Sequence, residues 1–148
     1  MEDQFVNFDI ALALKELGFD EPCMMCFIDE QYKYQHDLHF SSDMGSGALD
    51  RYTFKKNSDF SYSTSAPLWQ QVIDWLRDKK NMLLFVKMDD NSKYFCEIQS
   101  VTGRSQFHSP HWSEFDYFQA RKRGIEEAIK LLSTSNLWNA QKQVNLSK

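Results

Sequence analysis

The sequence predicts an α+β fold, a two-layer sandwich in which helices cover one face of an antiparallel sheet of about four to five strands. Three segments show apolar residues at spacings of three and four, which is typical of amphipathic helices. Between them lie shorter segments that alternate or are continuously apolar, as strands are. The resulting order, α-β-β-α-β-β-α, places two αββ units in succession and favours helices gathered on one side of the sheet.

The first helix is predicted over Phe5 to Leu17, where apolar residues recur with helical spacing. Asn7 or Asp3 is expected to cap its start, because a short polar side chain accepts a hydrogen bond from the first turn. Gly18 then stands where a left-handed residue ends a helix, and Pro22 prevents its continuation.

Two strands are predicted next, over Cys23 to Ile28 and over Tyr32 to Phe40. Residues 41–64 are rich in Ser, Asp, Gly and Asn and are predicted to form a long loop, with a short strand at Arg51 to Phe54. Loops of this length are uncommon in compact domains and are often functional or mobile.

The stretch from Ser65 to Ser100 is the centre of the predicted fold, because it combines an amphipathic helix with a hairpin. The helix is expected between Pro67 and Lys79, capped by Thr64 or Ser65. Its apolar stripe contains five residues, with Trp75 at the edge: Leu68, Trp69, Val72, Ile73 and Leu76.

The hairpin is predicted from an apolar run over Met82 to Met88, a turn at Asp89-Asp90-Asn91-Ser92, and an alternating strand from Tyr94 to Gln99. The preceding helix is expected to pack against the face of the hairpin that carries Cys96 and Ile98.

A third helix is predicted to begin at a Ser113 cap and to run to about Ser133. Gly124 lies within it at a cost of about 1 kcal/mol relative to Ala, which indicates close packing against another element. Residues 1–133 are predicted to form a single α+β domain, and residues 134–148 a frayed C-terminal tail.

Composition favours a globular binding protein. Apolar residues make up 42% and charged residues 26%, and the net charge of −4 argues against a dedicated nucleic-acid binder. Aromatic residues reach 15%, more than one core of this size needs, so some are expected at an interaction surface. An odd cysteine count and the lack of a signal peptide or membrane-spanning run predict a protein of the cytoplasm of the producing or host cell.

Two pairs of ligand-type residues could form a zinc site, Cys23-x-x-Cys26 and His36-x-x-His39. Each pair lies in a predicted strand, where positions three apart point to opposite faces. Buried cysteines also commonly behave as small apolar residues. The sequence therefore predicts neither a bound metal nor another cofactor.

The segment from Val101 to Trp112 is predicted to be irregular and contains His108-x-x-His111 beside Trp112. We interpret these residues, His108, His111 and Trp112, as a possible binding surface, although a loop could also bring the two imidazoles together as metal ligands. Cys96 lies on the predicted core face, and Asp89-Asp90 lies in a turn, so neither is interpreted as catalytic. No nucleotide-binding, zinc-protease or nucleophile-elbow motif occurs.

Three blocks of the sequence carry a resemblance, and together they cover about a third of the chain. They are Leu14 to Cys23 with its GFDEPC segment, Ser65 to Arg77 with SAPLWQQVIDWLR, and Tyr117 to Ala128. In them the chain resembles a family of small proteins found in phages, prophages and Bacteroidetes genomes. The resemblance implies a phage or prophage setting and brings no biochemical activity with it.

We therefore expect a non-enzymatic protein-binding or accessory module that acts through a protein partner or by self-association. The alternative is a protein associated with single-stranded nucleic acid, using sheet aromatics such as Phe95 or Tyr34 for base stacking. No contact with a membrane is expected.

Overall fold

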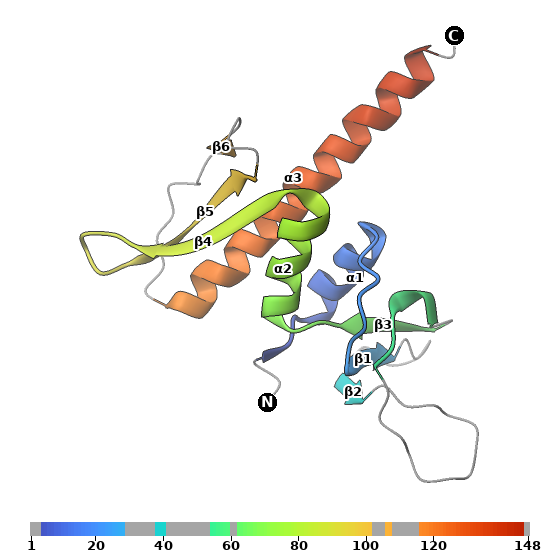
Figure 1. Ribbon diagram of the computed structural model, residues 1–148, viewed down its shortest axis with the longest axis horizontal. Helices are drawn as coiled ribbons and strands as arrows, with labels where there is room; N and C mark the ends of the chain where they lie inside the picture. Colours follow the sequence, from blue (N-terminus) through green and yellow to red (C-terminus); the bar gives the residue numbers. More distant parts are fainter. Residues whose placement is uncertain are drawn as a thin grey trace. The chain divides into compact units, whose positions relative to one another are not determined.

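A computed structural model of the chain describes residues 4–28, 38–40, 54–59, 62–101, 106–107 and 116–146 (Figure 1). The chain divides into two compact units, Met1–Val72 and Ile73–Lys148. We call these the N-terminal unit and the C-terminal unit and describe each by itself. The division falls inside helix α2 (Trp69–Lys80). The division does not test whether residues 1–133 form a single domain, so that statement remains a prediction.

Helix α1 (Phe8–Glu16) begins three residues after the predicted Phe5, while its cap at Asn7 and its stop at Gly18 are confirmed. Asn7 caps its start, and its side chain accepts a hydrogen bond of 3.0 Å from the amide of Ile10. At the other end Gly18 has a φ of 87°, a left-handed conformation that glycine adopts without strain. The amides of Gly18 and Phe19 donate to the carbonyls of Lys15 and Leu14, which is the pattern of a Schellman motif.

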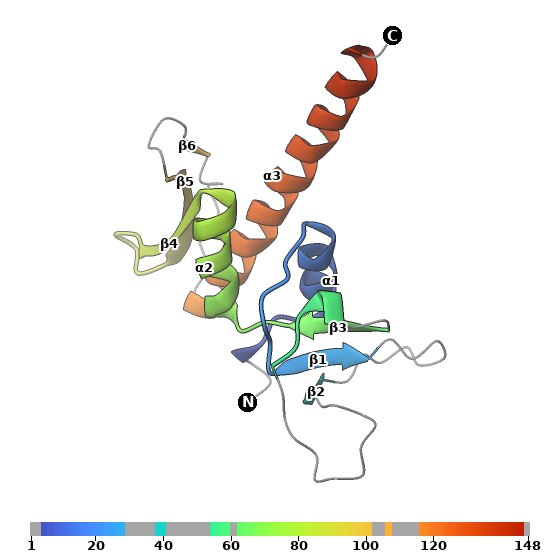
Figure 2. The same cartoon turned by 45° about the vertical axis from the view of Figure 1, so that its right-hand side comes forward.

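The N-terminal unit contains an antiparallel three-stranded sheet in the order β2-β1-β3, with α1 packed on β3 (Figure 2). The strands are β1 (Met25–Ile28), β2 (Leu38–Phe40) and β3 (Ser63–Ala66). Strand β3 lies where the sequence predicts the end of a loop and, at Thr64 or Ser65, a helix cap. That prediction is wrong because the polar segment pairs with β1 and is largely buried.

A buried asparagine fixes the segment before β3. Asn57 begins the 3-10 helix η2 (Asn57–Asp59) and lies in the interior. Its side-chain nitrogen donates to the carbonyl of Phe19 at 2.7 Å, and its side-chain oxygen accepts from the amide of Ser65 at 2.9 Å. One side chain thus satisfies two buried backbone groups, each of which would cost about 1–3 kcal/mol if left unpaired.

Helix α2 starts at Trp69 and is capped from within its first turn. The side-chain oxygen of Gln71 accepts from the amide of Leu68 at 2.9 Å. Trp75, predicted at the edge of the apolar stripe, is buried, whereas Leu68, predicted within the stripe, is exposed. The apolar face of α2 is therefore rotated relative to the prediction and consists of Trp69, Val72, Trp75 and Leu76.

The hairpin of the C-terminal unit is confirmed. Strands β4 (Met82–Met88) and β5 (Tyr94–Ser100) pair along their whole length, from Met82↔Ser100 to Met88↔Tyr94. In the turn between them, Asp89 accepts from the amides of Asn91 and Lys93, both at 2.9 Å. A short strand, β6 (Gln106–Phe107), adds to β5 within the segment predicted to be irregular.

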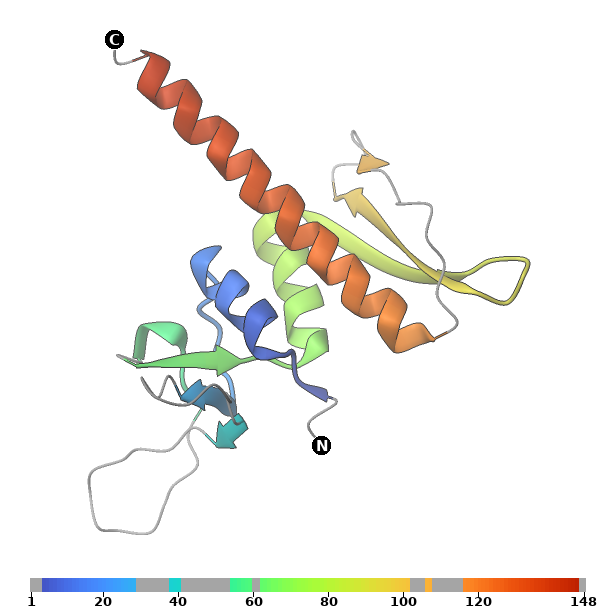
Figure 3. The same ribbon diagram turned by 180° about the vertical axis from the view of Figure 1, so that it is seen from behind.

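Helix α3 (Tyr117–Leu146) lies along the hairpin, as Figure 3 shows. It packs against the face carrying Cys96, a contact that the sequence does not predict. Gly124 permits this approach: a Cβ atom there would overlap Cys96 Sγ and lie 2.7 Å from Cys96 Cβ. The prediction that Gly124 marks close packing is thus confirmed. The helix continues to Leu146, beyond its predicted end near Ser133.

The α+β class is confirmed, whereas the single sheet of four to five strands is not. The described strands form two sheets of three strands each, β2-β1-β3 and β4-β5-β6. Every strand pairing is antiparallel, as predicted. Among the helices that the structure describes, none combines the length and the apolar character needed to cross a bilayer.

Candidate binding surface

Three aromatic rings and an arginine meet where β5 and α3 begin. We call Tyr94, Tyr117, Phe118 and Arg121 the aromatic–arginine cluster. The ring of Tyr117 is edge-to-face with Tyr94 at 5.9 Å and with Phe118 at 5.7 Å between centroids. The guanidinium of Arg121 lies 5.1 Å from the centroid of Phe118 and 5.9 Å from that of Tyr117. These are distances at which aromatic and cation–π attraction operate.

The cluster is accessible despite these contacts. Phe118 is 55% exposed and Tyr117 is 43% exposed, while Tyr94 and Arg121 are half-buried. Met88, the register partner of Tyr94, is 61% exposed and extends the apolar surface onto β4. Partial burial lowers the pKa of Arg121 from its ordinary value, and the neighbouring Tyr117 opposes this change. The guanidinium remains charged at neutral pH.

Local structure places each member of the cluster. Asp116 accepts a hydrogen bond of 2.7 Å from the amide of Phe118 and so fixes the start of α3. From there, Tyr117 and Phe118 lie four and three residues before Arg121, the spacings at which helix side chains meet. The Asp89 turn sets the hairpin register that places Tyr94 at the same end of the unit.

The chemistry of the cluster suits binding. Its four side chains offer three aromatic faces and one cation, and none is a carboxylate, an imidazole or a thiol. Tyr and Arg are enriched among the residues that dominate protein interfaces. Their mutual contacts restrict the movement of the rings, and side chains that are already restricted lose less entropy on binding.

The sequence alone does not predict this cluster. Its candidate surface, His108, His111 and Trp112, lies outside the described residues, so that assignment stays a prediction. A partial signal was present in the adjacent aromatics Tyr117-Phe118, but at helical spacing Phe118 falls on the apolar stripe of the third helix and is predicted to be buried. The contribution of Tyr94 has no such signal, since it depends on packing between distant segments.

The cysteine and histidine pairs give no metal site among the described residues. Cys23 and Cys26 are buried, and burial raises the pKa of the Cys23 thiol to about 12. His36 lies outside the described residues, whereas His39 belongs to β2 and is the register partner of Cys26. Burial likewise raises the pKa of Cys96 to about 11, which keeps that thiol protonated and agrees with its predicted role in packing.

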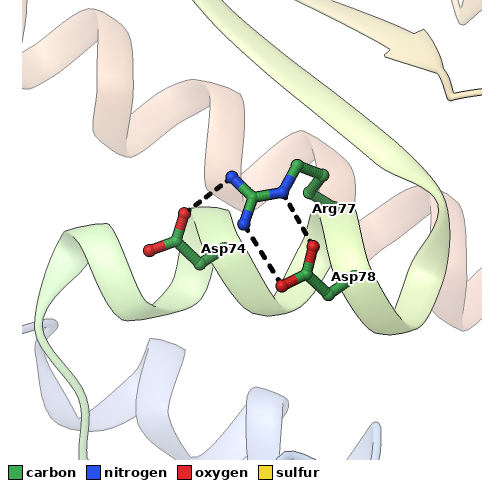
Figure 4. Close-up of polar contacts among 3 residues, drawn as sticks. All are labelled: Asp74, Arg77 and Asp78. Atoms are coloured by element: carbon green, nitrogen blue, oxygen red, sulfur yellow. Dashed lines mark hydrogen bonds and ion pairs between the residues drawn. The ribbon is translucent and has the colours of Figure 1, made fainter.

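Figure 4 shows a charged cluster on α2 that consists of Asp74, Arg77 and Asp78. Arg77 binds Asp78 through Nε at 2.7 Å and through a second nitrogen at 3.2 Å, and it binds Asp74 at 2.9 Å. Its hydrogen bond with Asp78 raises the pKa of Arg77 and lowers that of Asp78. All three side chains are solvated, so the cluster is a surface network of small energetic weight.

No protein-family model matches this sequence, and neither the curated proteins nor the solved structures provide a match. Its function must therefore be inferred from its own residues.

Proposed function

We propose that this protein is a non-enzymatic binding or accessory module that holds a protein partner through the aromatic–arginine cluster. The observation that supports the proposal is the combination of mutual contact and exposure in the cluster. Tyr117 contacts three other members while keeping 43% of its surface accessible, and Phe118 keeps 55%. Exposed aromatics held in this way provide apolar area at little cost in side-chain entropy.

The partner surface that fits the cluster is apolar with an acidic group beside it. Phe118 and Tyr117 would enter apolar pockets, and the positive charge of Arg121 would favour a carboxylate beside them. Truncating residues of this kind at the centre of an interface typically costs about 2 kcal/mol or more. The proposed setting is the cytoplasm of a bacterial or infected host cell, in keeping with the phage and prophage resemblance.

Site-specific photo-crosslinking in the producing cell tests the proposal. A benzophenone side chain at Phe118 should give a defined covalent adduct with one protein. The matched position is Tyr62, which is 79% exposed and belongs to the N-terminal unit, where the adduct should be missing. An Arg121→Ala change should reduce the yield of the Phe118 adduct at least tenfold. Equal adducts from both positions, or no adduct from either, would contradict the proposal.

The alternative function, association with single-stranded nucleic acid, draws support from a different feature of the same cluster. Arg121 opens a basic run in which Lys122 and Arg123 follow, and bases stack on exposed aromatics beside such charges. This alternative predicts a salt-dependent rise in the anisotropy of a labelled oligothymidylate, lost in a Phe118→Ala variant. Unchanged anisotropy at low salt would exclude it without affecting the crosslinking test.

A further inference from the structure

Among the residues that the structure describes, strand β4 is an edge of its sheet, and it lies on a surface other than the aromatic–arginine cluster. In the sheet order β4-β5-β6, β4 is an edge strand, and β5 is its only strand neighbour in the described part of the chain. The strand is seven residues long, and the register shows no break or bulge along it. An edge of this length offers a regular row of backbone donors and acceptors.

The hydrogen bonds at both ends of β4 show which residues face that edge. The carbonyl of Asn81 accepts from the amide of Val101 at 2.9 Å, and the amide of Asp89 donates to the carbonyl of Lys93 at 2.8 Å. Odd-numbered positions of the strand therefore direct their backbone groups toward β5, because these groups alternate in an antiparallel pair. The outward positions are the four even ones: Met82, Leu84, Val86 and Met88.

Within its own seven residues, β4 has few of the sequence features that protect an edge strand. Edge strands are normally protected by proline, by bulges or by several charges. β4 has no proline, and its one charged residue, Lys87, forms an ion pair with Glu97 of the neighbouring strand. The remaining residues are apolar, and Phe85 and Met88 are exposed at 40% and 61%.

We propose that β4 pairs with β4 of a second copy of this chain, antiparallel and centred on Phe85. This register covers the whole strand and sets Leu84 opposite Val86 and Met82 opposite Met88 of the second copy. Those are the outward-facing positions, so their amides and carbonyls fall into hydrogen-bonded pairs. The two Phe85 side chains meet at the two-fold axis, as in an isologous interface.

The position of Lys87 and the continuity of the α3-facing side both agree with this register. Lys87 would lie opposite Leu83 of the second copy, so the two ammonium groups are kept apart. The α3-facing side of one hairpin continues into the α3-facing side of the other, because the two-fold axis is perpendicular to the sheet. Two three-stranded sheets would thereby join into one. A heterologous strand would need to match this pattern by chance, whereas a second copy matches it by symmetry.

Cysteine crosslinking tests the register. In a non-hydrogen-bonded antiparallel pair the two Cβ atoms are about 4.5–5.5 Å apart, close to disulfide geometry. Under oxidised glutathione, a Phe85→Cys variant should therefore form a covalent dimer. The matched variant Lys87→Cys changes the same face of the same strand, yet its two cysteines would be about 13 Å apart, four residues of strand. It should crosslink at least tenfold less, as should the unmodified chain, whose three cysteines are buried.

Light scattering during size-exclusion chromatography tests the assembly itself. The full-length chain should be a dimer, and Phe85→Lys should raise its dissociation constant at least tenfold, because two cations would meet at the axis. Within the hairpin the new lysine would face Glu97, so the strand pair itself is preserved. Phe54→Lys, a change of the same kind at a 69% exposed position of the N-terminal unit, should leave the dimer intact.

Three results would overturn the proposal: a monomeric full-length chain, a dimer unaffected by Phe85→Lys, or equal crosslinking of the two cysteine variants. The proposal concerns a surface and a partner other than those of the aromatic–arginine cluster. Phe118→Ala should leave the dimer unchanged, so failure here is distinguishable from failure of the proposed function.

Discussion

The contact between Gly124 and Cys96 shows how a single missing side chain sets the distance between α3 and the hairpin. A Cβ atom on Gly124 would overlap Cys96 Sγ, lie 2.7 Å from Cys96 Cβ, and contact Leu84 Cδ2 at 3.5 Å. The Cβ of Cys96 moves only with its strand, so rotation of the side chain cannot relieve the overlap. Glycine is therefore required here by packing, even though it weakens the helix.

We expect Gly124→Ala to destabilise the protein. Alanine improves helix propensity by about 1 kcal/mol, but overpacking of a tight interior costs about 1–3 kcal/mol. Because strand backbone must move, the second term should dominate and lower the free energy of unfolding measured in urea. Combining the change with Cys96→Ala removes the sulfur and should recover part of the loss. Strict additivity of the two changes would contradict the contact.

The N-terminal unit should lose stability in acid, because its folded state is stabilised by the ionised carboxylate of Asp20. Its carboxylate accepts from the amide of Ser58 at 2.7 Å and from the hydroxyl of Ser58 at 2.9 Å, and the backbone hydrogen bond is the main cause that lowers its pKa. The folded pKa lies below the unfolded one, so the stabilisation is complete above the unfolded pKa and is lost as pH falls through the folded pKa.

In Asp20→Asn, which keeps an acceptor oxygen for Ser58, the fall of unfolding free energy on acidification should be shallower than in the unmodified chain. Carbon NMR of the Asp20 carboxyl gives its folded pKa directly. Identical pH profiles for the two proteins would show that Asp20 makes no contribution.

Among the elements, α2 shows how burial depends on tertiary context. Trp75 is 5% exposed and Leu68 is 37% exposed, the reverse of their predicted ranks on the helix. Trp75→Ala should lower the free energy of unfolding by about 3–5 kcal/mol, since it opens a large cavity. Leu68→Ala should cost less than about 1 kcal/mol, as surface changes do. Chemical denaturation of both variants tests the order, and equal losses would contradict it.

Prediction from sequence succeeded for elements whose signals are local. The hairpin over Met82 to Ser100 combines an apolar run, a polar turn and an alternating strand, and it forms where predicted. Strand β3 has the sequence Ser-Thr-Ser-Ala and no apolar pattern; it is a strand because β1, far away along the chain, pairs with it. The rotated face of α2 and the choice of α3 to cover Cys96 depend on packing in the same way.

A local sequence pattern cannot predict how the strands are arranged into sheets. It also cannot predict which residues form the candidate surface. Two αββ units are compatible with one sheet or with two, because pairing between units depends on long-range register rather than on periodicity. The aromatic surplus correctly indicated that rings lie at the surface. It could not indicate which rings, since Tyr94 and Tyr117 meet only after hairpin and helix have packed.

The whole molecule raises a question of cooperativity, because its two units share one helix. The division between Val72 and Ile73 cuts α2 near its middle, and an isolated helix fragment of a few residues is unstable in water. Loss of either unit should therefore weaken the half of α2 that belongs to the other. We expect the two units to unfold together rather than one at a time.

Hydrogen exchange measured by mass spectrometry tests this expectation. Leu14, in α1, is fully buried, and Leu14→Ala should cost about 2–5 kcal/mol. The faster exchange that follows should extend beyond α1, β1 and β3 along α2 as far as Lys80, because the helix cannot stay half formed. Leu12→Ala, on the exposed side of the same helix, serves as the control and should change exchange little. Acceleration that stops at Val72 would show that the units unfold independently and that α2 does not couple them.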